Sequence, residues 1–203
     1  MADSTLNPRT LTLTILIVVL FTCGMFWLNR SDIPLGYTRY ENYGFSLVYP
    51  KLMYLRETGL PGIGLGSDPS DFVGLVQCQS YWDNKLDVFE IIWLVKNRAS
   101  SAQSELDEFL AAISQPNSVV QGVSEHFMIT PHGEEVDCTY FELEEAGNAF
   151  SGIIGVIYRS WSSPGLARVY FVAYVTLKGS ATEEQIRASF QAYLDGFSIQ
   201  KPE

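Results

Sequence analysis

The chain has 203 residues, and subtracting the first 35 leaves 168, enough for one domain with a packed core but too few for two. Hydrophobic residues make up 47% of the chain and aromatic residues 13%, which is typical of a packed protein rather than a disordered one. The formal net charge is −10. Because an acidic surface repels phosphate groups, this charge excludes nucleic acid as an expected partner.

The strongest local signal is a run of 18 uncharged residues at positions 11–28. As a helix, this run would be about 27 Å long, close to the hydrocarbon thickness of a bilayer. Trp27 suits the membrane interface. We therefore expect a tail over residues 1–10, a single-pass transmembrane helix over residues 11–28 and a linker over residues 29–36. A cleaved signal peptide and a lipoprotein modified at Cys23 are the alternatives, although the sequence has no Ala-x-Ala site there and the apolar run continues past Cys23.

After the linker, apolar and polar side chains alternate along the sequence, as they do in β-strands. Residues 37–50 predict a hairpin that turns at residues 42–44 and ends at Pro50. Further strands are expected over residues 53–57, 70–80 and 87–96. The last of these is apolar on both faces, apart from Glu90, which predicts that other layers cover it on both sides. The glycine-rich residues 59–66 match no phosphate-binding spacing and predict a loop.

The second half of the domain predicts two helices around a run of strands. Residues 100–114 place apolar side chains at helical spacing, and Ser100 with Gln103 fits a capping box. Thr182 and Gln185 form a second capping box in front of a closing helix. Strands expected over residues 118–130, 134–144, 149–161 and 166–177 are joined by short turns. Such a succession predicts an antiparallel meander.

A family resemblance rests on the opening and closing segments of the domain. The opening carries Tyr40, Asn42, Gly44, Phe45, Tyr49 and Pro50, and the closing helix reads Glu-Glu-Gln-Ile-x-x-Ser-Phe from Glu183 to Phe190. These segments resemble PsbP-like proteins, which are related to the extrinsic PsbP subunit of photosystem II. The resemblance implies an α+β fold over residues 37–203, an α/β/α sandwich with a central antiparallel sheet. It also implies a binding or assembly module located outside the cytoplasm.

No residue constellation in the sequence predicts catalysis or metal binding. His126 and His132 have no ligand partner at metal-site spacing and are expected to be solvated. Cys78 and Cys138 are expected to be buried free thiols, with one disulfide as the alternative in an exported domain. A segment with six acidic residues predicts a solvated acidic surface with carboxylates on both faces, and the alternatives are weak calcium binding or a basic partner. These residues are Glu134, Glu135, Asp137, Glu142, Glu144 and Glu145.

We therefore expect a non-enzymatic, membrane-anchored module that engages a protein partner, with its C-terminal domain outside the cytoplasm. The alternative is a small-ligand-binding domain with a pocket between sheet and helix. A hydrolase whose site is scattered through the sequence is a third hypothesis. Neither a cofactor nor a metal is expected. The residues expected to contact a partner or ligand are Tyr40, Tyr43, Trp93, Tyr158 and Tyr174.

Overall fold

The computed structural model describes residues 33–60, 73–82, 85–96, 101–113, 118–121, 123–160 and 167–200. The predictions for residues 11–28 and for Cys23 lie outside these ranges, as do those for Ser100 and for most of the glycine-rich loop. No helix within the described ranges is long and apolar enough to cross a bilayer.

Most of the described strands form one large antiparallel sheet, in the order β3-β4-β5-β10-β9-β8-β6, with β7 also paired to β8. The predicted meander is confirmed for β8, β9 and β10, which pair in sequence order. The single strand expected over residues 118–130 is instead split into β6 and β7. The bounds are β3 (Tyr54–Leu60), β4 (Val73–Trp82), β5 (Lys85–Lys96), β6 (Ser118–Gln121), β7 (Phe127–Ile129), β8 (Val136–Glu145), β9 (Asn148–Ser160) and β10 (Ala167–Leu177).

The opening hairpin forms a second, smaller sheet with the end of the chain. Strands β1 (Tyr37–Asn42) and β2 (Phe45–Pro50) pair as predicted, and β2 pairs on its other side with β11 (Phe197–Ile199). The turn places Tyr43 at φ +51° and Gly44 at φ +76°. Two positive φ values are typical of the type I′ form of a two-residue hairpin turn, and Gly44 adopts its value without the strain of a Cβ atom.

Two α-helices, α2 (Ala102–Ile113) and α3 (Glu183–Asp195), and one 3-10 turn, η2 (Pro131–Gly133), lie among the described residues. The predicted capping box of α3 is confirmed. Thr182 Oγ1 accepts a hydrogen bond from the Gln185 N–H at 3.3 Å, and Gln185 Oε1 accepts one from the Thr182 N–H at 2.9 Å. At α2, the observed contact comes from Ser101, whose Oγ accepts from the Ser104 N–H at 3.1 Å.

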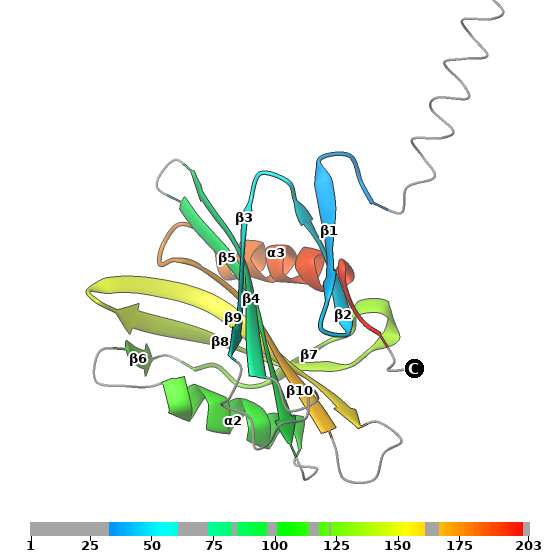
Figure 1. Ribbon diagram of the computed structural model, residues 1–203. Coiled ribbons are helices and arrows are strands. Elements are labelled where there is room, and N and C mark those ends of the chain that lie inside the picture. The colour runs from blue at the N-terminus through cyan, green and yellow to red at the C-terminus, as the bar shows by residue number, and fades with distance from the viewer. Residues whose placement is uncertain are drawn as a thin grey trace, which may run out of the picture.

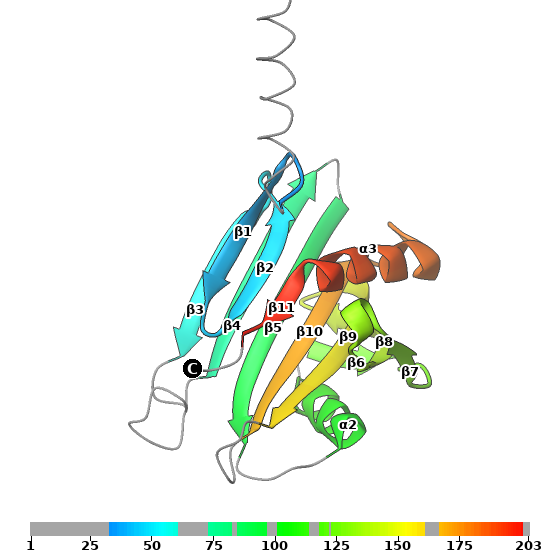
Figure 2. The same ribbon diagram turned by 90° about the vertical axis from the view of Figure 1, so that its right-hand side faces the viewer.

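The two faces of the large sheet are covered differently (Figures 1 and 2). On one face, α3 and the small sheet pack together over a core that includes Phe45, Trp93, Tyr170 and Phe190. On the other face, α2 packs over a smaller cluster around Leu106 and Phe171. The prediction that β5 is enclosed by layers on both sides is therefore confirmed only in part, because α2 reaches one end of its face.

The predicted fold class, an α/β/α sandwich, is wrong, and the transmembrane helix predicted in front of it falls on residues that the structure does not describe. The described chain is mostly β, with two antiparallel sheets and two α-helices. The layer opposite α2 is shared between one helix and a sheet, because Phe45 of the hairpin packs against Trp93 and Tyr170 rather than extending the large sheet edge to edge.

Candidate functional site

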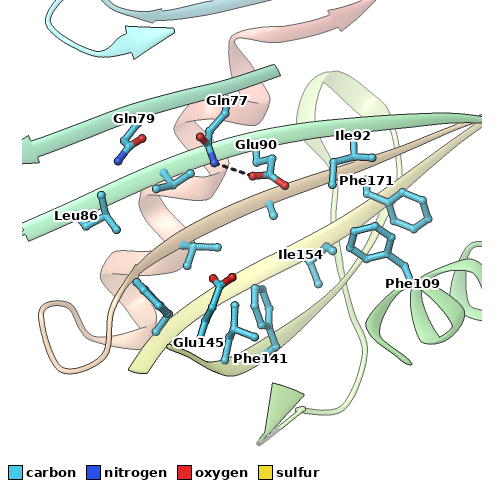
Figure 3. A pocket seen from close by; sticks show the side chains of 15 residues that line it. Gln77, Gln79, Leu86, Glu90, Ile92, Phe109, Phe141, Glu145, Ile154 and Phe171 are labelled. Carbon is cyan, nitrogen blue, oxygen red and sulfur yellow. Dashed lines mark hydrogen bonds between the residues drawn. The ribbon is translucent and has the colours of Figure 1, made fainter. Parts of the chain in front are cut away.

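The part of the large sheet that α2 leaves uncovered forms an apolar trough with a volume of about 430 Å³ (Figure 3). This volume is in the range of small-ligand sites in proteins. Five strands form its floor and walls, and Phe109 of α2 closes one end. The lining residues are Gln77, Gln79, Leu86, Val88, Glu90, Ile92, Phe109, Phe141, Leu143, Glu145, Phe150, Ile154, Phe171, Ala173 and Val175.

Small residues in the central strands make the hollow. Ala173 of β10 lies between Glu90 of β5 and Ile154 of β9 in the strand register, so a single methyl group occupies the middle of the floor. Gly152 of β9 contributes no side chain, and the ring of Phe141 lies over it: a Cβ atom at this glycine would come within 3.1 Å of Phe141 Cε1. The trough therefore follows from residue size at adjacent register positions.

The end of the trough is fixed by α2. The ring of Phe109 stacks on Phe171 of β10 with their centroids 4.2 Å apart, as Figure 3 shows. Leu106 and Leu110 hold the helix in place because both are buried against the same face of the sheet. At 12 residues, α2 is about 18 Å long, too short to cover the full length of the strands beneath it.

Polar groups lie on two sides of the apolar floor. Gln77 Nε2 donates a hydrogen bond to Glu90 Oε2 at 2.9 Å, from the register position directly across the β4–β5 pair. Burial raises the pKa of the Glu90 carboxyl, the negative Glu145 adds to the increase, and the Gln77 hydrogen bond and Arg56 oppose it. Figure 3 shows the Glu90 and Glu145 carboxylates on opposite sides of the trough. Such an arrangement favours a ligand that donates hydrogen bonds or carries positive charge there.

Two of the expected contact residues, Tyr40 and Tyr43, instead join the opening hairpin to β3. Both hydroxyls donate to Glu57, Tyr40 at 2.9 Å to Oε2 and Tyr43 at 2.5 Å to Oε1. Burial and the Glu57 contact raise the pKa of the Tyr40 hydroxyl. The Tyr43 ring also lies 4.9 Å from that of Trp93, so this group links the two sheets.

The other three expected residues also lie outside the trough lining. Trp93 and Tyr174 are buried in the core on the face covered by α3, where Tyr174 donates to Asp87 Oδ1 at 2.7 Å. Tyr158 packs beside the α2 cluster, on the same face as the trough. The signal that marks the site in the sequence is Glu90, the one charged residue in the apolar central part of the strand over residues 87–96.

The residues considered for metal binding or redox chemistry have structural contacts. His126 is not solvated as expected, since its Nδ1 lies 3.0 Å from Asp137 Oδ1 and its Nε2 3.4 Å from Asp107 Oδ1 of α2. His132 Nε2 lies 2.6 Å from the carbonyl oxygen of Asp195. Among the residues that the structure describes, no group of three or more histidine, cysteine, aspartate or glutamate side chains is placed to hold a metal ion.

The two described cysteines are buried free thiols, as expected. Cys78 lies in β4 and Cys138 in β8, four strand positions apart in the sheet, or about 19 Å at the usual strand spacing. This separation excludes the alternative of a disulfide between them. The predicted split of the acidic segment between two faces is confirmed, because Glu142 binds Lys178 at 2.7 Å while Glu145 lines the trough on the other face.

Comparison with known proteins gives a weak structural likeness. No family model and no curated protein matches the sequence, so the resemblance to PsbP-like proteins is not confirmed. Among solved structures, the fold is similar to that of LpqN, described as involved in cell envelope biogenesis of Mycobacterium tuberculosis. The TM-score is 0.44 at 11% sequence identity, and the match covers 72% of this chain and 92% of that chain.

Proposed function

We propose that this chain is a non-enzymatic binding module held at the cell membrane by residues 11–28, with its folded domain outside the cytoplasm. The trough is its binding site. The observation that carries this proposal is an open apolar hollow of about 430 Å³ in the middle of an otherwise well-packed sheet, with a largely buried carboxylate beside it. Apolar hollows with a few convergent polar groups are typical of ligand sites.

The ligand class follows from the lining. Most of the lining side chains are apolar, which favours an aliphatic or aromatic body. Among the lining residues that the structure describes, the polar ones are two glutamines and two glutamates, and none is a lysine or an arginine. A donor or cationic group on the ligand is therefore favoured over an anionic one, because Glu90 and Glu145 repel negative charge.

Calorimetric titration of the full chain in phosphatidylcholine nanodiscs tests this function. Three ligands with the same eight-carbon chain but different head groups are titrated: octylammonium, octanol and octanoate. Titration of empty nanodiscs measures partitioning into lipid, which is subtracted. We expect octylammonium and octanol to bind and octanoate to bind least.

A matched pair of variants assigns the binding to the trough. Ala173→Leu adds a branched side chain to the middle of the floor and should abolish binding, because the added carbons occupy the ligand's volume. Ala192→Leu makes the same change on the exposed side of α3 and should leave binding intact. Equal binding by both variants, or no heat above that of empty nanodiscs for any probe, would refute the trough as a ligand site.

A protein partner is the second candidate function, and the edge strand β3 favours it. This strand is the first in the order of the large sheet, and β4 is its only partner among the described strands. An edge strand presents backbone groups to which an extended segment of another protein can add. A photo-crosslinking residue in place of the exposed Arg56 should then capture a discrete partner in intact membranes, whereas one in place of Lys178 should not.

A further inference from the structure

Large apolar side chains are exposed at one end of the domain. We define the end surface by five of them together with two lysines: Leu35, Tyr37, Leu52, Tyr54, Tyr81, Lys51 and Lys85. Leu35 is 96% exposed, Leu52 97%, Tyr54 69% and Tyr81 66%. Single exposed apolar residues are ordinary on a protein surface, but several large ones at the same end of a domain are typical of an interaction surface.

Backbone pairing places these residues together. The Lys51 N–H donates to the Gly36 carbonyl at 2.9 Å, which brings Leu35 and Leu52 to the same end. Tyr54 pairs with Gln79, two residues from Tyr81. Figure 2 shows the starts of β1 and β3 at the same end of the domain as the end of β4 and the start of β5.

The end surface is also where the chain arrives from the apolar residues 11–28. Leu35 lies seven positions after residue 28, and seven residue-to-residue steps span at most about 25 Å in a fully extended chain. If residues 11–28 lie in a bilayer, as the proposed function holds, this end of the domain stays close to the lipid surface.

The chemistry of the end surface suits a zwitterionic lipid interface. Tyrosine is enriched at membrane–water interfaces because its ring is apolar and its hydroxyl is polar. Lys51 and Lys85 are exposed at this end, and lysine can place its aliphatic stem against lipid while its amine stays in water. The net charge of −10 disfavours a strongly anionic bilayer.

We propose that the end surface docks the domain on the headgroup interface of a zwitterionic phospholipid bilayer. The inference rests on the proposed membrane attachment. Docking in this way also orients the trough. Tyr54 pairs with Gln79 and Tyr81 pairs with Leu86, and both partners line the trough, so one end of the trough opens beside the lipid. An amphiphilic ligand can then pass between bilayer and trough with little of its apolar body exposed to water.

The test uses the full chain in phosphatidylcholine vesicles, with Cys23→Ser to remove the thiol outside the described domain. A nitrobenzoxadiazole label is attached to Lys51→Cys, and in a matched protein to Met128→Cys. Met128 is an exposed apolar residue of β7, and Figures 1 and 2 show β7 away from the end of the domain where β1 and β3 begin. We expect lipids that carry a nitroxide near the headgroup to quench the label at position 51 several-fold more than the label at position 128.

A second variant removes the apolar contacts while keeping the label at position 51. Leu35→Ser, Leu52→Ser and Tyr54→Ser together should reduce quenching there several-fold, with an unchanged circular dichroism spectrum because all three side chains are exposed. Flotation of each protein with the vesicles reports attachment separately. A chain that does not float overturns the membrane attachment and the docking with it. A chain that floats with equal quenching at both sites, or with quenching that the serine variant does not change, overturns the docking alone.

Discussion

Gly74→Ala probes how tightly the layer between the two sheets is packed. Gly74 lies across from Trp93 in the β4–β5 register, and a Cβ atom there would be 1.9 Å from Trp93 Cζ2. The closest real Cβ contacts are about 3.0 Å, so the indole would have to move by about 1.1 Å. It has little room, because it is 2% exposed and its ring centroid lies 4.9 Å from that of Tyr43 and 5.4 Å from that of Phe45.

The expected loss of stability is the difference between two terms. Overpacking of a close-packed core costs about 1–3 kcal/mol, and replacing glycine by alanine in a strand returns roughly 0.5–1 kcal/mol of backbone entropy. We therefore expect Gly74→Ala to lower the free energy of unfolding by about 1–2 kcal/mol, with an unchanged slope in urea. Urea denaturation followed by far-ultraviolet circular dichroism measures this value.

A double-mutant cycle tests whether the clash between a Cβ atom at position 74 and the Trp93 indole causes the loss of stability. In a Trp93→Leu background the indole is absent, so Gly74→Ala should cost nothing or stabilise the fold slightly. A neutral Gly74→Ala, or an equal loss in both backgrounds, would contradict the packing described here. Either result would also indicate that the Trp93 indole can move, so that Trp93 would again be a candidate for ligand contact.

Three further outcomes follow from the structure. Because burial raises the pKa of Glu90 above its unfolded value, the cost of its charge is present at neutral pH and absent below the unfolded pKa. Thermal melting should therefore show Glu90→Gln to be more stable than wild type at pH 7, with the advantage shrinking towards pH 4; an advantage independent of pH would contradict this account. Burial raises the pKa of Cys78 and of Cys138 to about 12. In a Cys23→Ser chain at pH 8, a maleimide should therefore label neither thiol until urea is added. Rapid labelling of the folded chain would instead show that these strands open. Thr182→Ala should lower the free energy of unfolding by about 1 kcal/mol through loss of the α3 cap, whereas Thr182→Ser should lose much less.

Local signals predicted the local structure of this domain well. The Asn-Tyr-Gly turn, the apolar alternation and the Thr182–Gln185 cap act within a few residues, and each element they predict is present: the β1–β2 hairpin, strand β5 and helix α3. The two buried thiols were also predicted, since both cysteines sit in apolar strands. Such features depend on the geometry of one strand or one helical turn, which the sequence displays directly.

Long-range pairing was not predicted. The hairpin joins the three residues of β11 at the far end of the chain, and no local pattern marks so short a strand as a partner. The residues expected to contact a partner or ligand lie outside the trough for a related reason. Aromatic residues were chosen by type, but the strand pairing turns Trp93 and Tyr174 into the core and brings Tyr40 and Tyr43 to Glu57.

The sequence by itself determined an acidic domain of strands and two helices behind an apolar segment, because composition and periodicity act locally. Only the tertiary structure decided where binding is possible. The trough exists because Ala173, Gly152 and Glu90 come from three different strands and meet on the face that the short α2 leaves uncovered. The end surface exists because the starts of β1 and β3 and the end of β4 lie at one end of the domain. Both depend on which strands lie side by side in the folded domain, and no local pattern in the sequence shows this.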